Sequence, residues 1–194
     1  MPLLAIIALP VVILFYIVGT YNTFQTIKTR ITASIQEIGN QLKRQADLIP
    51  NLEESVKGYL KHEKDIFQKL TDARKQVTAA IKSGATQKMI EASSAISQLL
   101  PALQVVVEDN PELKGETTVS KLMDELRDTS DKVMYARRTL IDLAADFNRM
   151  LVTVPSNFIG MLFGFKPEKG LDTPMEGEHI SVSAAETKSP KISL

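Results

Sequence analysis

MPLLAIIALPVVILFYIV, residues 1–18, is apolar almost throughout, and the chain carries no charged side chain before Lys28. A helix rises about 1.5 Å per residue, so about 20 apolar residues cross the roughly 30 Å hydrocarbon layer of a bilayer. Pro2 to Tyr21 has that length. A proline in mid-span, as at Pro10, is tolerated as a kink in a transmembrane helix. Residues 1–21 are therefore predicted to form a transmembrane anchor.

A cleaved secretory signal is the alternative interpretation of this segment. Such signals begin with Lys or Arg, contain a shorter apolar run, and end in small residues at the cleavage site. This chain has no basic start, and Gly19-Thr20-Tyr21-Asn22 is a poor cleavage site. The sequence favours a retained anchor.

Basic residues follow the apolar segment directly, since Lys28 and Arg30 precede the first acid, Glu37. Positive charges beside a membrane span favour the cytoplasmic side. The pattern predicts that the rest of the chain lies in the cytoplasm, with the opposite side of the membrane as the alternative.

The overall charge is balanced, because 23 Lys and Arg residues match 23 Asp and Glu residues. No global field gathers polyanions, so nucleic-acid binding is not expected. The chain has no cysteine, which excludes disulfides, thiolate metal sites and cysteine nucleophiles. The roughly 170 residues after the anchor are enough for one domain with its own core.

Apolar residues after the anchor recur at helical spacing. The first stripe contains Phe24, Ile27, Ile31, Ile35, Ile38 and Leu42. Pro50 predicts that this helix is interrupted within residues 47–52, where Asp47 could cap a second helix that ends at Ser83-Gly84. However, the apolar residues on both sides of Pro50 stay nearly in heptad phase, which leaves one continuous, kinked helix as the alternative.

A third helix is predicted over residues 87–108, and a fourth over residues 117–155. Pro101 is expected to kink the third helix or to mark a boundary inside it. No window alternates with a period of two between turn residues, so no strand is expected. The predicted fold class is all-α, with an N-terminal transmembrane helix followed by an antiparallel bundle of three to four long helices.

Two further segments follow this bundle. Residues 158–165 are apolar on all sides and need cover, from lipid, from another subunit, or by packing on the core as a loop. An up-and-down bundle returns them to the membrane, whereas a continuous first helix is expected to place them far from the lipid. Residues 168–194 are predicted to be a disordered tail that a partner could order. The expected division is anchor 1–21, helical domain 22–157, membrane-proximal or oligomer-contact segment 158–167, and tail 168–194.

Catalytic motifs are nearly missing from the sequence. His62-Glu63 begins an HExxH pattern, but that metalloprotease motif needs a second histidine at position 66, which is Ile. The remaining histidine, His179, lies in the tail. No metal site, no nucleotide-binding motif and no cofactor are therefore expected.

Several short blocks are more specific than helix packing requires. They are Tyr21-Asn22, Gln41-Leu42-Lys43-Arg44, Asp47-Leu48-Ile49-Pro50-Asn51-Leu52, Val56-Lys57-Gly58-Tyr59, His62-Glu63 and Ala73-Arg74. On these blocks the chain resembles the LemA family of bacterial membrane proteins, over about residues 12–168. The blocks that also agree are Glu108 with Pro111-Glu112-Leu113-Lys114, Ala136-Arg137-Arg138, Phe147-Asn148, Pro155 with Asn157, and Phe163-Gly164-Phe165-Lys166.

The sequence also departs from the family pattern. Gln45 replaces the second arginine of the usual pair, Asn110 replaces the usual tyrosine before Pro111, and Leu140-Ile141 replaces one expected Tyr-Asn pair. Phe147 replaces the tyrosine of the other pair. If those residues bind a shared ligand in the family, this chain is a divergent member.

The resemblance implies an all-α domain on a single-pass anchor in the bacterial inner membrane, and a family without an established enzymatic activity. The expected partners are the lipid bilayer, further copies of this chain and other membrane proteins, and no small-molecule substrate is evident. The cytoplasmic side is expected, with the periplasm as the alternative. The candidate motif and interaction residues are Tyr21, Asn22, Lys43, Arg44, Asp47, Pro50, Asn51, Gly58, Tyr59, His62, Glu63, Arg74, Pro111, Arg137, Asn148, Pro155, Asn157, Phe158, Phe163 and Phe165.

Three functions compete at this point. The first is a non-enzymatic, self-associating membrane scaffold, favoured by the surplus of apolar surface. The second is an adaptor or regulator of a membrane protease or an envelope stress pathway, with the tail as a docking segment. The third is an enzyme that uses His62, Glu63 and Arg74, which is disfavoured because 11 residues of helix separate Glu63 and Arg74 by roughly 17 Å.

Overall fold

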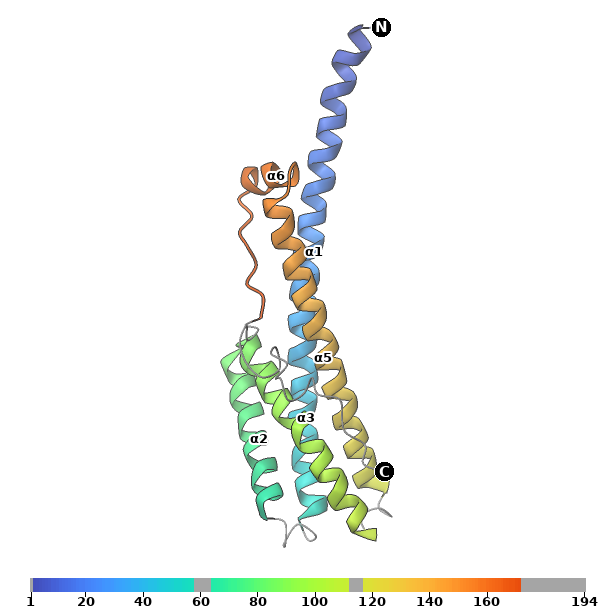
Figure 1. Cartoon of the computed structure of the whole chain (residues 1–194), viewed down its shortest axis with the longest axis vertical. Helices are drawn as coiled ribbons and strands as arrows, with labels where there is room; N and C mark the ends of the chain where they lie inside the picture. Colours follow the sequence, from blue (N-terminus) through green and yellow to red (C-terminus); the bar gives the residue numbers. More distant parts are fainter. Residues whose placement is uncertain (1, 58–63, 112–116, 172–194) are drawn as a thin grey trace, which may run out of the picture.

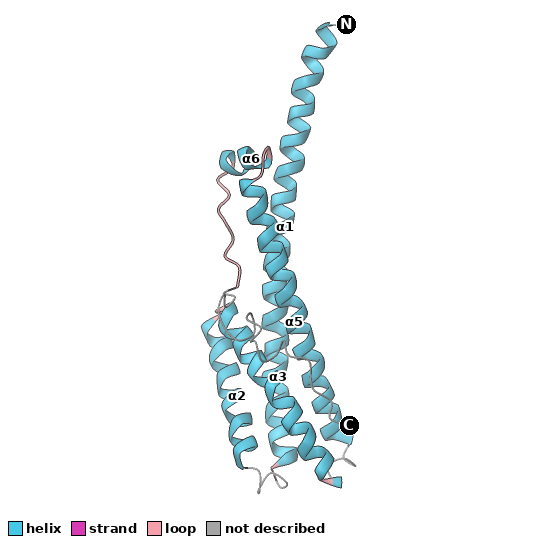
Figure 2. Cartoon of the chain, viewed as in Figure 1, coloured by secondary structure: helices cyan, strands magenta, loops and turns pink. Residues whose placement is uncertain are grey.

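The computed structural model describes residues 2–57, 64–111 and 117–171. These residues form α helices joined by short loops and contain no strand, so the all-α prediction is confirmed for them (Figure 2). The helices are α1 (Pro2–Val56), α2 (Lys64–Ser83), α3 (Thr86–Asp109), α5 (Thr117–Val152) and α6 (Ser156–Leu162).

Helix α1 is the longest helix, and the other helices lie beside it (Figure 1). It descends the whole length of the structure, α2 and α3 form an antiparallel hairpin beside its lower half, and α5 ascends along it (Figure 1). The lower half is therefore an up-and-down bundle of four helices. Among the described residues, the upper half consists of α1, α5, α6 and the segment after α6, and the first turns of α1 project beyond the other described elements (Figure 1).

The continuous first helix, left open by the sequence, is the arrangement observed. Helix α1 passes through Pro50 and ends at Val56, so Asp47 lies inside the helix and does not cap a new one. Proline in a helix interior costs about 3 kcal/mol because it removes one hydrogen bond and crowds the preceding turn. Around it Leu48, Ile49 and Leu52 are buried, and each such side chain contributes about 1.5–3 kcal/mol. Apolar burial on both sides of the proline outweighs its cost.

Helix α2 begins at Lys64 and not within residues 47–52 as predicted, because α1 continues to Val56, whereas the remaining helix boundaries lie close to their predicted places. Helix α2 ends at Ser83, where Gly84 has φ +64° and donates its N–H to the carbonyl of Ile81 at 3.2 Å. Glycine adopts this left-handed conformation without the steric cost that other residues meet, which explains the tight turn into α3. Pro101 is accommodated inside α3 and is no boundary.

Helices α1 and α3 are each long and apolar enough to cross a membrane, judged by length and composition. In α3, 44% of the apolar window is buried inside the protein, so this helix is better explained as part of the core. In α1 only 11% of the window is buried, and its side chains from Leu9 to Val18 are largely exposed. The candidate membrane span is therefore the N-terminal part of α1.

The lower half of the bundle encloses an aliphatic core, which we call the four-helix core. All four long helices contribute to it, and its members are Leu, Ile, Val, Met and Ala side chains with a relative exposure of 9% or less. Its most deeply buried members include Leu42, Ile49, Leu52, Leu70 and Leu126.

The upper half encloses a second core, which we call the α1–α5 core. It is built from Phe24, Ile31 and Ile38 of α1, from a stripe of α5 that ends at Phe147, and from Ile159 of α6. Only Ile90 of α3 reaches it with a buried side chain. The predicted stripe from Phe24 to Leu42 thus serves both cores in turn.

A polar contact lies where the two cores meet. Gln45 of α1 has no exposed surface, and its Nε2 donates to Ser93 Oγ of α3 at 3.2 Å and to Ser130 Oγ of α5 at 3.0 Å. The Oε1 atom of Gln45 is buried and accepts no hydrogen bond. One buried amide therefore links three helices.

A continuous α1 was expected to place the apolar segment after α5 far from the lipid, yet this segment packs against Ile17, Tyr21 and Phe24, where the predicted anchor ends. Helix α2 ascends and helix α3 descends, so the chain is again at the lower end of the bundle where α5 begins. Helix α5 then ascends along α1 (Figure 1). The extended segment after α6 then descends beside α5 to residue 171 (Figure 1). Of the tail predicted to be disordered, residues 168–171 are described and ordered, since Glu168 pairs with Asn148 and Leu171 packs against the α1–α5 core, and residues 172–194 lie outside the described part.

Candidate interaction surfaces

Five aromatic rings join α6 and the chain after it to α1 and α5. Phe165 stacks on Phe24 with centroids 4.7 Å apart and meets the edge of Phe147 at 6.0 Å. Phe24 and Phe147 contact each other edge to face at 5.3 Å, and Tyr21 packs on Phe163 at 4.7 Å. Phe24 and Phe147 are fully buried. Four of these residues, Tyr21, Phe147, Phe163 and Phe165, belong to the sequence blocks that carry the family resemblance.

Close packing fixes α6 against the tops of the two long helices. Gly160 is buried, and a Cβ atom there would lie 2.7 Å from Cδ2 of Leu151 and 3.7 Å from the ring of Phe24. The neighbouring Ile159 is buried in the same core. No larger residue fits at position 160 without displacing Leu151.

The amide of Asn148 holds the descending segment to α5. Its Nδ2 donates to the carbonyl of Glu168 at 2.9 Å, and its Oδ1 accepts the N–H of Glu168 at 2.9 Å. The side chain thus pairs with one peptide unit as a neighbouring strand would. Asn148 is one of the candidate motif residues, and its partner is the chain backbone twenty residues later.

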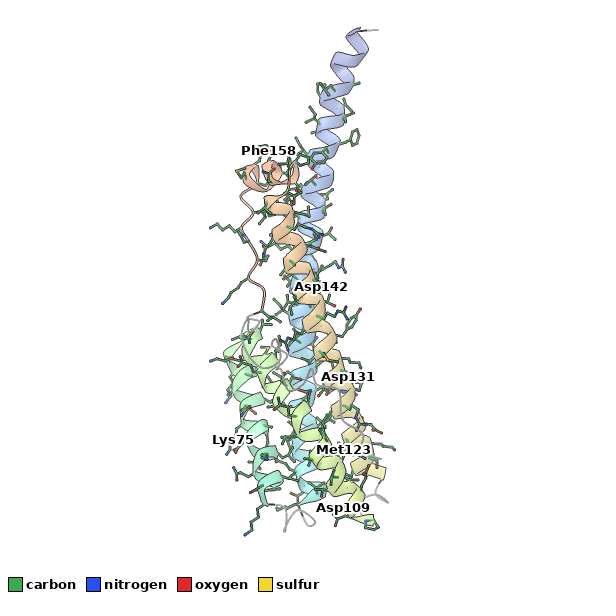
Figure 3. All side chains as sticks on the ribbon, in the orientation of Figure 1. Lys75, Asp109, Met123, Asp131, Asp142 and Phe158 are labelled. Carbon is green, nitrogen blue, oxygen red and sulfur yellow. The ribbon has the colours of Figure 1, made fainter. Side chains whose placement is uncertain are left out.

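The outer surface of this end of the molecule is apolar. Phe158, at the tip of the bundle in Figure 3, is 60% exposed, and Met161 and Leu162 are 70% and 69% exposed. Val152, Val154 and Phe163 add to the same region with exposures between 48% and 78%. We call these six residues the apical patch.

A second exposed surface lies on the side of the bundle, where α1 and α5 meet. A groove of about 520 Å³ is lined by Glu37 of α1 and by Asp131, Tyr135 and Arg138 of α5 among others. A smaller groove of about 270 Å³ continues it toward Arg30, over the short side chains Ala33, Ser34, Ala136 and Thr139. Met134 and Tyr135 stand at its rim, 65% and 75% exposed. We call this surface the α1–α5 groove, and Asp131 marks its position in Figure 3.

Two of the predicted basic residues form ion pairs between helices. Arg74 of α2 contacts Glu53 of α1 at 2.9 Å, and the Glu53 side chain is only 12% exposed. Arg44 of α1 contacts Glu125 of α5 at 3.2 Å, with both side chains 48% exposed. Arg74 therefore has a structural partner, which weakens the hypothesis that it acts in catalysis.

The remaining candidates are scattered. The side chains of Asn22, Lys43, Asp47, Asn51, Pro111 and Pro155 are exposed, and those of Pro50, Arg137 and Asn157 are half-buried. Asn51 donates to the carbonyl of Asp47 at 3.3 Å, and Asn157 accepts the N–H of Phe158. Gly58, Tyr59, His62 and Glu63 lie outside the described residues. The functional roles of all these positions stay predictions.

Sequence reasoning missed two features. Gln45 was identified as a departure from the family pattern and not as a buried amide between three helices. Met134 and Tyr135 lie off the apolar stripe of α5, and two adjacent large apolar residues on the polar side of a helix are the signal that could have identified the α1–α5 groove.

The described residues hold few features of an enzyme site. Within residues 2–57, 64–111 and 117–171, no three His, Cys, Asp or Glu side chains are grouped so as to hold a metal ion. Hydrogen bonds from Gln68 and then Lys75 lower the pKa of Asp72 on the outside of α2, where the carboxylate lies on a solvated helix face. The acidic side chains of the described residues are spread over helix surfaces and do not converge on one centre.

The geometry defines a class of protein: an all-α bundle whose N-terminal helix is a candidate membrane span. The chain matches the LemA family over residues 34–183, and it belongs to that family. It is also similar to "Magnetosome protein MamQ" of Magnetospirillum gryphiswaldense, with 24% identity over 169 residues, which cover 75% of this chain. The match covers 62% of that relative, so this chain aligns with less than two thirds of the relative's length.

Proposed function

We propose that this protein is a non-enzymatic membrane scaffold whose copies associate side by side through the α1–α5 groove. The observation that carries the proposal is the exposure of Met134 and Tyr135, 65% and 75%, at the rim of a groove between the two longest helices. Tyr and Met are enriched where protein surfaces meet, because both bury a large area with little polar cost.

The groove is shaped to receive such a side chain. Its floor continues over Ala33, Ser34, Ala136 and Thr139, whose side chains are short, so the space above them is empty. A tyrosine ring from a neighbouring copy has a volume that this groove can accept. The proposed contact therefore places Tyr135 of each copy against the groove of the other.

The charges around the groove favour two copies that stand in the same membrane. Anchors in one bilayer make the helices of two copies parallel, so each level of one copy meets the same level of the other. Asp131 and Lys132 are adjacent at one level, and Glu37 and Arg138 line the same groove. Acidic and basic side chains therefore lie close together along the groove, which permits ion pairs between two parallel copies in place of repulsion between like charges.

The proposed location is the cytoplasmic face of the bacterial inner membrane. Lys28 and Arg30, both exposed, follow the apolar part of α1 and support this side. Because the chain has no cysteine, a Lys75→Cys variant on α2 offers one labelling site. We expect a membrane-impermeant maleimide to leave it unlabelled in intact spheroplasts and to label it after lysis, and labelling of intact spheroplasts would assign the bundle to the periplasm.

Self-association is tested on the full-length protein, extracted in mild detergent and transferred to nanodiscs. Light scattering with detergent correction and mass photometry give the number of copies per particle. The test variant is Met134→Glu with Tyr135→Glu, which places charge at the rim of the groove. The matched control is Val105→Glu, because Val105 is an exposed apolar residue, 55% accessible, on α3.

The proposal predicts multimers for the native chain and the Val105 variant, and a shift to monomers for the Met134 and Tyr135 variant. A native chain that is monomeric in both detergent and nanodiscs contradicts self-association. Multimers that persist in the Met134 and Tyr135 variant contradict the groove as the contact surface.

A further inference from the structure

We infer that α6 and the apical patch lie in the lipid headgroup and upper acyl region of the bilayer, beside the anchor, so that the protein binds one leaflet with a second element besides its span. This contact involves lipid and differs from the contact between copies proposed above. The inference rests on the level of α6 along α1, on the chemistry of its exposed face, and on its internal hydrogen bonds.

Helix α6 lies at the level where the apolar run of α1 ends. Tyr21 of α1 packs on Phe163 at 4.7 Å, and the ring of Phe24 lies 3.7 Å from the position of a Cβ at Gly160. Ile17, still within the apolar run, packs against the same core. A span that ends near Tyr21 places the membrane surface at these residues, and α6 is therefore beside that surface.

The exposed face of α6 has the composition of a membrane-interface helix. From Val152 to Phe165 the sequence contains no charged residue, and the apical patch exposes two aromatic and four aliphatic side chains, Met included. The first charged residues on either side, Arg149 and Lys166, are basic and exposed. Apolar side chains at the acyl boundary with basic residues at phosphate height are typical of elements that lie in an interface.

Several backbone groups around α6 are hydrogen-bonded within the segment, which lowers the cost of placing them in an apolar medium. At its end, the N–H groups of Phe163, Gly164 and Phe165 donate to carbonyls of Ile159, Met161 and Gly160 at 3.0–3.2 Å. At its start, the Ser156 hydroxyl lies 2.7 Å from the carbonyl of Met150, and Asn157 donates its N–H to Thr153. These hydrogen bonds are compatible with a position at the lipid interface.

The lipid bilayer is the partner that best explains the apical patch, because the patch lies beside the apolar part of α1. The apical patch lies at the level where the exposed apolar side chains of α1, from Leu9 to Val18, end, because Ile17 and Tyr21 pack beside α6. Whatever covers α1 at that level also meets α6. If α1 is in lipid, α6 lies at the edge of the same lipid.

The depth of α6 can be measured with spin labels on the full-length protein. Since the chain has no cysteine, Met161→Cys and Lys75→Cys each provide one nitroxide site, and both native side chains are exposed, so neither change disturbs a core. The protein is placed in nanodiscs of phosphatidylethanolamine and phosphatidylglycerol. Collision rates of each nitroxide with oxygen, which concentrates in lipid, and with a water-soluble nickel chelate are then compared.

The inference predicts a ratio of oxygen to nickel collisions that is severalfold higher at position 161 than at position 75. Equal ratios with strong nickel collisions at both sites would place α6 in water and overturn it. Low collision rates with both reagents at 161 would show a protein contact over the apical patch, which also overturns it. Because position 161 is far from the α1–α5 groove, this result is independent of whether copies self-associate.

Discussion

The two cores of this protein differ in chemistry and in what they hold together. The four-helix core is aliphatic, and every one of its helices packs against at least two others. The α1–α5 core is rich in aromatic rings and joins only two long helices, to which α6 and residues 163–171 are attached. The first resembles the interior of an ordinary soluble bundle, whereas the second ends in an uncovered apolar surface.

The global stability of the domain and the attachment of α6 thus depend on different cores. Loss of a side chain from the four-helix core affects all four helices and should unfold the domain as a unit. Loss of an aromatic contact from the α1–α5 core should release α6 and the segment after it, while the long helices stay folded. Four substitutions test this contrast.

The largest effect is expected from Leu126→Ala in the four-helix core. Leu126 is fully buried, and truncation of a buried leucine costs about 2–5 kcal/mol because it removes apolar contacts and leaves a cavity. Urea unfolding followed by circular dichroism measures the change. Lys121→Ala on the exposed side of the same helix is the control and should change stability by less than about 0.5 kcal/mol. Equal losses of unfolding free energy in the two variants would contradict the burial of Leu126 in the four-helix core.

Gln45 tests the junction between the cores. Gln45→Ala should cost about 2 kcal/mol, since it leaves a cavity and removes the partner of two buried serine hydroxyls. Gln45→Leu should cost less than about 1 kcal/mol, because it restores the volume and each serine can turn to a carbonyl of its own helix. If both variants are equally destabilised in urea, the amide hydrogen bonds matter more than the volume.

Phe165→Ala tests the upper core. We expect the free energy of local opening to fall by about 2 kcal/mol, through lost apolar area and ring contacts with Phe24 and Phe147. Hydrogen exchange should therefore accelerate in residues 156–171, with the exchange of α2 and α3 unchanged. Faster exchange throughout the chain would mean that the two cores unfold as one unit.

Asn148→Ala tests the attachment of the descending segment. It removes the two hydrogen bonds to Glu168 and should weaken local protection by about 1 kcal/mol. Asn148→Asp retains an acceptor for the Glu168 N–H and should protect that amide better than alanine does. Exchange at Glu168 that is the same in both variants and in the native chain would show that the aromatic rings alone hold the segment.

Much of the fold follows from residue spacing in the sequence. The stripe through Phe24, Ile31 and Ile38, the turn at Gly84 and the long fourth helix were all predicted from periodicity and from glycine and proline positions. The continuity of α1 through Pro50 could not be predicted, because it depends on whether tertiary burial outweighs a local cost. The place of α6 was left open between two arrangements, since the return of the chain toward the anchor depends on α2 and α3 running in opposite directions.

The candidate surfaces were predicted less completely than the fold. Phe158, Phe163 and Phe165 were recognised because an uncharged run of that length is visible in the sequence alone. The partner of Asn148 and the partners of Gln45 lie far away along the chain, so no local pattern identifies them. The α1–α5 groove needs two helices brought side by side before its short side chains form a surface.

The central claim is that the upper half of the protein sits at the bilayer and holds the four-helix core away from it. Neutron reflectometry on the full-length chain in a supported bilayer measures this directly, as the thickness of the protein layer outside the headgroups. From Tyr21 to Val56 helix α1 rises about 50 Å, so the account predicts a layer of about that thickness, densest at its outer part. A layer of only about 20–30 Å, the width of a bundle of helices each about 10 Å across lying flat on the membrane, would contradict it.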